Sequence, residues 1–130
     1  LPETRVGVLP DAGSIRLLRL LPRQLTNEII FGGRRLSAQE AMNWGIANRV
    51  SPSSEVMNTA RALAAEICLS APLSVAAVLD IIRTTEDLSI ADSYAAMRAN
   101  AAYIAAINSQ DAMEGPTAFA EKRDPIWKGK

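Results

Sequence analysis

The sequence has 130 residues, enough for one domain with a buried core. Lysine and arginine together number 14, as do aspartate and glutamate, so the formal net charge is zero and no nucleic-acid partner is expected. The sequence contains no histidine, which excludes Ser-His-Asp and Cys-His catalytic arrangements and most zinc sites, so no metal is expected. Acid–base chemistry must then come from carboxylates, lysines or tyrosines.

No apolar stretch reaches the roughly 18 residues that a membrane helix needs, and the start lacks the pattern of a secretory signal. The single cysteine, Cys68, cannot form an internal disulfide, and its apolar neighbours predict packing inside a helix. Together these features predict an intracellular, cytoplasmic protein without a membrane partner.

Turn and capping signals divide residues 1–50 into five predicted segments. Residues 4–9 and 46–50 favour extended structure, and helices are predicted over 12–21, 23–31 and 38–44. Pro22 breaks the first helix, and two glycines after Phe31 close the second. The third begins with the capping box Ser-Ala-Gln-Glu at residues 37–40.

The rest of the sequence is strongly helical, with helices predicted over 56–67, 72–83, 89–107 and 117–123. A glycine and Pro116 are predicted to interrupt the last stretch. Roughly two-thirds of the residues are then helical, against about a third in typical proteins. A lone short strand cannot satisfy its own edges, so the sequence looks like the later part of a larger fold.

Three segments in this order, LPETRVGVLPDAG, GGRRLSAQEAMNWGIANRV and AFAEKRDPIWKGK, resemble the crotonase family of enoyl-CoA hydratases and isomerases. The ending DAMEGPTAFAEKRDPIWKG is especially similar to the carnitinyl-CoA dehydratases of that family. The resemblance implies a mostly α chain that forms the C-terminal part of a crotonase-like α/β fold, a spiral of ββα turns followed by a helical trimerisation region. Residues 1–50 then correspond to the end of the spiral core, and residues 51–130 to the helical oligomerisation region.

The resemblance covers the second half of the family's usual length. It implies reversible hydration or dehydration of an acyl-CoA thioester, with acyl-CoA as substrate, no separate cofactor, and assembly into homo-trimers or hexamers. The oxyanion-hole amides, most of the CoA pocket and the first catalytic glutamate would come from the other half. Residues 1–130 alone are therefore expected to be nearly inactive. Two alternatives stay open: an enoyl-CoA double-bond isomerase and a non-catalytic helical assembly fragment.

By the same resemblance, Glu3 occupies the position of the family's second catalytic glutamate. Burial of a carboxyl group favours its neutral form, which suits proton exchange near neutral pH. Asp11 has two interpretations: a cap for the following helix, or a carboxylate that faces the substrate, as in some relatives. Gly13 corresponds to the turn that approaches the acyl pocket, where Ser14 replaces a frequent second glycine.

Near the C-terminus, Phe119 and Lys122 match the family pattern Phe-x-Glu-Lys-Arg. The resemblance implies that they contact the adenine and phosphates of CoA, often in a neighbouring subunit. An aromatic face suits a base and a lysine suits a phosphate. A core phenylalanine and a solvated lysine are the alternative.

Overall fold

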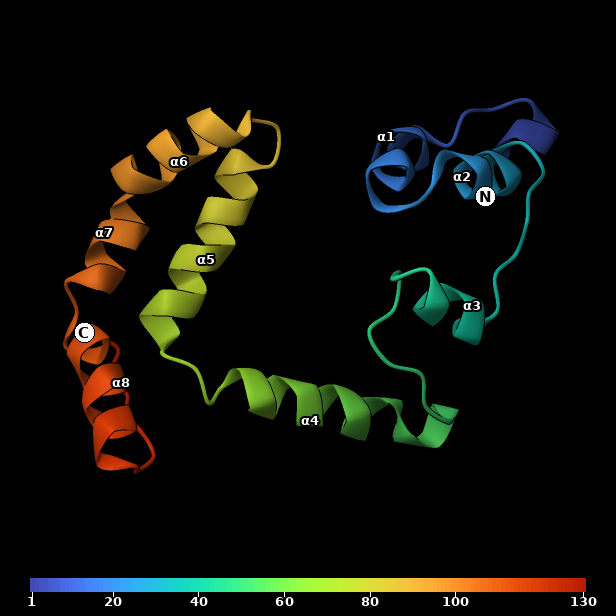
Figure 1. Ribbon diagram of the computed structural model, residues 1–130. Helices are drawn as coiled ribbons and strands as arrows, with labels where there is room; N and C mark the ends of the chain where they lie inside the picture. Colours follow the sequence, from blue (N-terminus) through green and yellow to red (C-terminus); the bar gives the residue numbers. More distant parts are fainter. The chain divides into compact units, whose positions relative to one another are not determined.

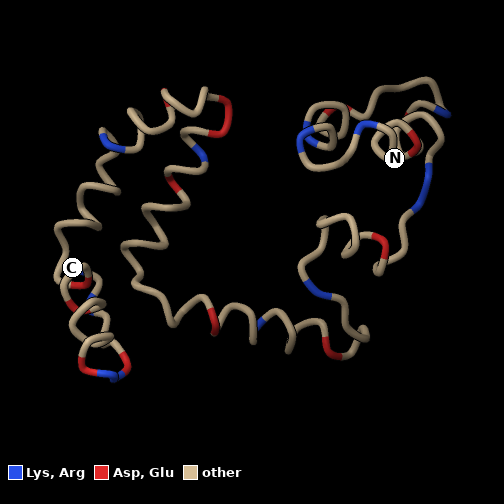
Figure 2. The backbone as a smooth tube through the Cα atoms, in the orientation of Figure 1, with Lys and Arg blue, Asp and Glu red and all other residues tan.

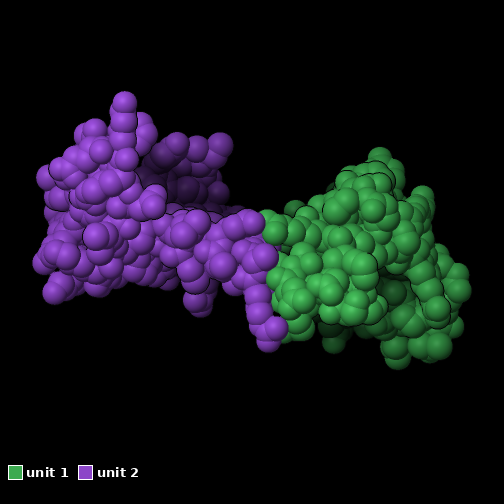
Figure 3. Space-filling view, turned by 90° about the horizontal axis from the view of Figure 1, so that it is seen from below, with its two compact units in different colours: residues 1–60 green, residues 61–130 purple.

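Helices account for 66% of the chain in the computed structural model, which describes residues 1–130 and contains no β-strand (Figure 1). The prediction of a mostly α chain is therefore confirmed. The chain divides into two compact units, Leu1–Ala60 (unit 1) and Arg61–Lys130 (unit 2), which Figure 3 colours separately. The predicted boundary between spiral core and oligomerisation region, after residue 50, stays a prediction.

Unit 1 contains five short helical segments and the start of a sixth. They are η1 (Glu3–Val6), α1 (Asp11–Leu20), α2 (Arg23–Ile30), α3 (Ala38–Asn43), η2 (Ser53–Glu55) and α4 (Val56–Ile67), which continues into unit 2. The core is formed by Leu21, Leu25 and Ile29, with Leu17 and Leu36 packed against it. Thr26 is completely buried, and its hydroxyl donates to the carbonyl of Leu17 (3.4 Å).

The strand predicted over residues 4–9 is wrong. A 3₁₀ turn forms there instead, because Gly7 takes a left-handed conformation (φ 79°) and the N–H of Val8 donates to the carbonyl of Glu3 (3.1 Å). No strand forms over 46–50 either, since the N–H groups of Ile46 and Ala47 both turn back to the carbonyl of Ala41. Both segments lack a neighbouring strand to pair with.

Unit 2 is built from α5 (Pro72–Thr85), α6 (Ile90–Ala99), α7 (Ala101–Ile107) and α8 (Gln110–Glu121), followed by an irregular tail. Helix α5 lies alongside α6 and α7 (Figure 1). The buried apolar side chains of this unit are three alanines, Ala77, Ala106 and Ala118. Many larger apolar side chains stay exposed, and few charged residues lie along α5, α6 and α7 (Figure 2).

The long helix predicted over residues 89–107 is broken at Asn100. This residue is extended (φ −71°, ψ 126°) and caps α7, since its side-chain oxygen accepts the N–H of Tyr103 (3.0 Å). Its side-chain nitrogen donates to Asp80 of α5 (2.6 Å). A cap followed by an alanine-rich run is hard to distinguish from helix interior in sequence, because the partner in α5 is 20 residues away.

The predicted interruption at Gly115 and Pro116 is also wrong, because α8 runs through both. A residue before proline avoids the helical conformation mainly because its Cβ meets the proline ring, and Gly115 has no Cβ. The ring of Trp127 lies over Gly115, within 3.5 Å of where a Cβ would be. The Gly-Pro pair therefore weakens the helix without ending it.

No single helix is long and apolar enough to cross a membrane. The adjacent segments Ser53–Ile67 and Pro72–Thr85 meet the length and composition criteria only as a pair, with a bend of 104° between them.

Candidate functional site

Glu3 lies at the start of η1, and its carboxylate is the most unusual polar group in the chain. Atom Oε2 is shielded from solvent and has no hydrogen-bond partner, the only buried side-chain nitrogen or oxygen of which this is true. Nearly all buried polar atoms in proteins are hydrogen-bonded, so each exception calls for an explanation. A carboxylate oxygen kept free in this way has unused capacity to accept a proton or a hydrogen bond.

Two side chains anchor η1 to the end of α2. The hydroxyl of Thr4 donates to the carbonyl of Ile30 (2.6 Å), and the guanidinium of Arg5 donates to the carbonyl of Gly32. These bonds satisfy carbonyl groups that the end of a helix leaves free. The turn that carries Glu3 is thereby held against α2, although the sequence contained no recognisable signal for either contact.

Asp11 is the first residue of α1, and its side chain is exposed. The capping interpretation is wrong, because Pro10 occupies the cap position and no side chain accepts a hydrogen bond there. Proline preceding the helix displaces the cap by one residue, so Asp11 enters the first turn instead. The substrate-facing role of Asp11 stays a prediction.

Gly13 lines a pocket of about 410 Å³ in unit 1. A Cβ on Gly13 would lie 2.7 Å from Cδ1 of Leu1, so the absence of a side chain is what allows Leu1 to pack there. The pocket is lined by Leu1, Ala12, Gly13, Arg16, Leu17, Ile29, Arg34, Leu36 and Ile46. Neither Glu3 nor Asp11 is among the lining residues. Of the three site residues predicted in unit 1, only Gly13 therefore lies at this pocket.

Arg34, at the pocket wall, belongs to an ion-pair network that sequence reasoning missed. Its guanidinium bonds Glu28 at the end of α2 and Glu40 in α3 (2.8 Å to Glu40), and both carboxylates raise the pKa of Arg34. Glu40 also completes the capping box predicted for residues 37–40, since it accepts the N–H of Ser37. That N–H, together with Arg34, lowers the pKa of Glu40 from 4.5 to about 2. Glu40 is therefore ionised throughout the neutral range.

Phe119 and Lys122 lie at the C-terminal end of α8 in unit 2. The ring of Phe119 is 87% exposed, which contradicts the core interpretation of this residue. Lys122 follows the last helical residue and is exposed, and its ammonium group has no hydrogen bond or ion pair. An exposed aromatic ring and a cation three residues apart are suited to a base and a phosphate, respectively.

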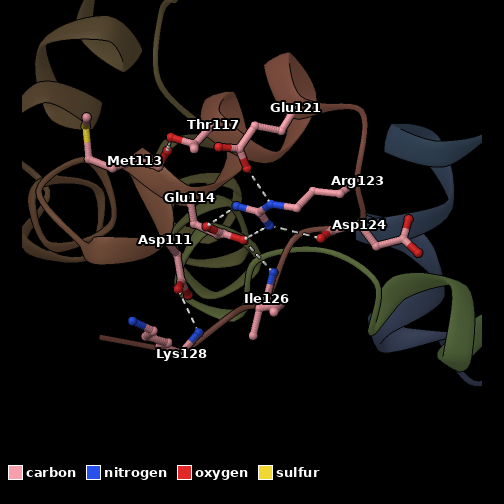
Figure 4. A network of polar contacts seen from close by, with 9 residues as sticks. All are labelled: Asp111, Met113, Glu114, Thr117, Glu121, Arg123, Asp124, Ile126 and Lys128. Atoms are coloured by element: carbon pink, nitrogen blue, oxygen red, sulfur yellow. Dashed lines mark hydrogen bonds and ion pairs between the residues drawn. The ribbon is translucent and has the colours of Figure 1, made fainter.

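A second polar network extends from the first turn of α8 to its C-terminal end, and sequence reasoning missed it as well (Figure 4). Asp111, which is 3% exposed, accepts the N–H groups of Lys128 (2.7 Å) and Gly129 (2.9 Å). One turn later, Glu114 pairs with Arg123 (2.6 Å). Two acids three residues apart share a helix face, so the letters DAME at residues 111–114 were the available signal.

Cys68 follows α4 and is exposed, so the prediction that it packs inside a helix is wrong. It contributes to a mainly apolar pocket of about 420 Å³ in unit 2. This pocket lies where α4 ends and α5 begins, and the tail residue Trp127 closes one side of it by donating its indole N–H to the carbonyl of Leu69 (2.7 Å).

Comparison with known proteins agrees with these features. Residues 1–130 match the family model described as enoyl-CoA hydratase/isomerase. Carnitinyl-CoA dehydratases of Salmonella agona and Escherichia coli are each 47% identical over 133 residues, which is all of this chain and 51% of theirs. The chain spans about half the length of the curated relatives it matches.

Solved structures give the same result. An enoyl-CoA hydratase from Bacillus anthracis superimposes with a TM-score of 0.88 at 34% identity, over 100% of this chain and 50% of its own. An enoyl-CoA hydratase from Mycobacterium marinum gives 0.88 at 33% identity, over 100% of this chain and 51% of its own. With a family model that matches every residue, the chain belongs to the enoyl-CoA hydratase/isomerase family.

Proposed function

We propose that this chain forms the C-terminal half of the catalytic unit of an enzyme that reversibly hydrates or dehydrates an acyl-CoA thioester, with carnitinyl-CoA as the substrate class. The observation that carries the proposal is the Oε2 atom of Glu3, which is shielded from solvent, without a hydrogen-bond partner, and set on a turn anchored to α2. The 47% identity with carnitinyl-CoA dehydratases over the whole chain supports the choice of substrate.

In this proposal Glu3 holds or transfers the proton of the reaction. Hydration of an enoyl thioester requires one group that positions or deprotonates water and one that delivers a proton to Cα, and dehydration reverses both steps. The free Oε2 atom of Glu3 suits either task because no protein group competes for it. Asp11 is proposed to face the acyl group, and Gly13 to leave room beside it.

Phe119 and Lys122 are proposed to contact the nucleotide part of CoA. Their exposure, and the free ammonium group of Lys122, support this role. Acyl-CoA is the substrate in this scheme, and no separate cofactor takes part. The cytoplasm is the proposed location, since acyl-CoA esters are intracellular metabolites.

Assembly into trimers or hexamers is proposed from the surface of unit 2. Large apolar side chains are exposed along α5 and α6, among them Leu79 (57%), Ile82 (55%), Ile90 (79%) and Tyr94 (56%). Large exposed apolar patches are rare on monomers and usually mark an interface, so these side chains support an assembly through α5 and α6. Sedimentation at micromolar concentration distinguishes such an assembly from a monomer.

The test of the catalytic proposal is a chimaera in which residues 1–130 replace the matching half of the Escherichia coli carnitinyl-CoA dehydratase. We expect the chimaera to dehydrate carnitinyl-CoA, and Glu3→Gln to lower kcat by at least about 10²-fold with little change in KM. Glu55→Gln is the matched control, because Glu55 also lies in a 3₁₀ helix of unit 1 but is exposed.

Near-normal kcat in the Glu3→Gln chimaera would remove Glu3 from the reaction. Incubation of the active chimaera with an enoyl-CoA in H₂¹⁸O separates the two chemistries of the family, because hydration places the label in the product and isomerisation does not. A product without label would favour the double-bond isomerase.

A further inference from the structure

The turn after α8 contains the one residue other than glycine with a positive φ, Lys122 (φ 56°, ψ 40°). Glycine usually occupies such a position at a helix end, because a side chain disfavours the left-handed conformation. A lysine here gives up backbone stability to place a cation at a defined point. Residues held in such conformations cluster at functional sites.

The left-handed turn is closed by two backbone hydrogen bonds. The N–H of Lys122 donates to the carbonyl of Phe119 (3.2 Å), and the N–H of Arg123 donates to the carbonyl of Ala118 (3.1 Å). These bonds are the usual closure of a helix that ends in this way. They fix the backbone at residue 122 only while residue 123 stays in place.

The side chain of Arg123 supplies that restraint (Figure 4). Its guanidinium donates to both carboxylate oxygens of Glu114 (2.6 and 3.1 Å), and its Nε donates to Glu121 (2.6 Å). A bidentate arginine–carboxylate pair is geometrically specific, so it fixes the direction of the chain as well as the charge. The clamp formed by Glu114, Glu121 and Arg123 therefore straddles Lys122 in sequence.

Glu114 is in turn held by the tail. Its Oε1 atom also accepts the N–H of Ile126 (2.8 Å), and Arg123 followed by this N–H lowers the pKa of Glu114 from 4.5 to about 2. The clamp is consequently charged at neutral pH and joined to the segment that follows it.

The two adjacent cations thus differ in availability. The donors of Arg123 are directed at two carboxylates and at the carbonyl of Asp124 (3.1 Å), whereas the ammonium group of Lys122 has no protein partner. An anion that approaches this helix end meets a free lysine and an arginine already neutralised by acids.

We propose that Glu114 and Arg123 are positioning residues that hold the end of α8 so that Lys122, and not Arg123, receives a phosphate group of CoA. The inference rests on the proposed role of Lys122 in binding the nucleotide part of CoA. In this proposal Arg123 acts only on the geometry of the helix end. Glu114, although an acid near the phosphate site, improves the binding of the anion because it holds Arg123 in place.

The test is calorimetric titration of the chimaera with CoA at low ionic strength, because most of the CoA pocket is expected from the other half of the family's fold. We expect Lys122→Met to weaken binding about fivefold, the scale of one lost phosphate contact. Glu114→Gln and Arg123→Lys are expected to weaken it by a similar factor, because each removes the bidentate pair. Glu40→Gln is the matched control: it removes one of the two carboxylates paired with Arg34 in unit 1 and leaves α8 intact.

The direction of the change in CoA affinity in Glu114→Gln shows whether Lys122 or Arg123 binds the phosphate. If Arg123 itself binds the phosphate, removal of its acid partner frees the guanidinium and tightens binding, which overturns the proposal. Unchanged binding, or an equal loss in Glu40→Gln, also overturns it, since the clamp is then only structural. If Lys122→Met in the chimaera has no effect on CoA binding, the proposed role of the α8 end is wrong irrespective of the clamp.

Discussion

Each unit holds one arginine between two glutamates, but the two networks are built over different distances. In unit 1, Arg34 is six residues from both Glu28 and Glu40 and joins the end of α2 to the start of α3. The whole network therefore spans one loop and its flanking turns. It stabilises a connection that the chain makes in any case.

In unit 2, Arg123 joins Glu121 to Glu114, nine residues earlier in α8, and Glu114 also holds the tail at Ile126. Asp111 extends the same contact surface by binding the N–H groups at 128 and 129, which are 17 and 18 residues away. Similar chemistry thus closes a loop in unit 1 and docks a terminal segment in unit 2. We infer that the tail and the end of α8 depend on each other, whereas the segments of unit 1 depend more on their apolar core.

The two tryptophans allow this comparison to be tested, because Trp44 lies in unit 1 and Trp127 in unit 2. The variant Trp44→Phe leaves a reporter for unit 2, and Trp127→Phe leaves one for unit 1. Urea unfolding followed by fluorescence then measures the free energy of unfolding at each reporter.

The largest expected effect is that of Asp111→Ala. Its carboxylate is buried and accepts two backbone N–H groups, so its removal leaves both donors without a partner. We expect the free energy of unfolding at Trp127 to fall by about 2–3 kcal/mol. Asp11→Ala is the control, since Asp11 also opens a helix but has no such bonds, and it should change the value at Trp44 by less than about 0.5 kcal/mol.

An equal loss at both reporters after Asp111→Ala would show that the two units unfold together. A loss below about 0.5 kcal/mol at Trp127 would mean that the tail is not docked through Asp111.

A smaller effect is expected for Gly33→Ala in unit 1. Gly33 has φ 62°, and a Cβ there would lie 2.9 Å from Nε of Arg5, so we expect a loss of about 1–2 kcal/mol at Trp44. The comparison variant is Gly115→Ala in unit 2. Its Cβ meets only ordinary contacts with Trp127, and the helix gain of about 1 kcal/mol is offset by the clash before Pro116. Its net effect at Trp127 should be near zero, and a loss equal to that of Gly33→Ala would refute this account of the Gly-Pro helix.

The smallest expected effect concerns pH. Glu40 and Glu114 each have a pKa lowered from 4.5 to about 2 in the folded chain. Their stabilisation is therefore complete above about pH 4.5 and is lost as the pH falls toward 2, because the unfolded chain takes up protons first. Urea midpoints at pH 7 and pH 3 measure the loss.

Glu40→Gln should flatten the pH dependence at Trp44 only, and Glu114→Gln that at Trp127 only. Unaltered slopes in both variants would show that other carboxylates control acid unfolding.

Local signals in the sequence predicted a good part of the fold. The capping box at Ser37 and Glu40 formed as expected, and proline and glycine signals marked the ends of α1 and α2. The helical period predicted α4 and α5 within a few residues of their bounds. These features depend on residues within one or two turns of one another, which a single sequence displays directly.

Several errors occurred where a distant partner decided the outcome, whereas the capping error at Asp11 was local, because Pro10 takes the cap position. The break at Asn100 involves Asp80, the course of α8 through Pro116 involves Trp127, and the 3₁₀ turn at Glu3 forms because no neighbouring strand pairs with it. Secondary-structure propensity depends on residues close together in the sequence, so it cannot predict contacts between segments that are far apart in the sequence. The candidate site residues were found through family resemblance, since an isolated glutamate after a proline carries no signal of its own.

The sequence by itself determined the helical class of this protein, the capping box at residues 37–40, the ends of α1 and α2, and the family to which it belongs. The tertiary structure alone decided that Glu3 keeps a buried oxygen free, that Asp111 and Glu114 hold the tail, and that Lys122 rather than Arg123 presents a free cation. The physical reason is that helix formation depends on neighbours along the chain. The availability of a charge depends instead on which polar groups folding brings within hydrogen-bond distance.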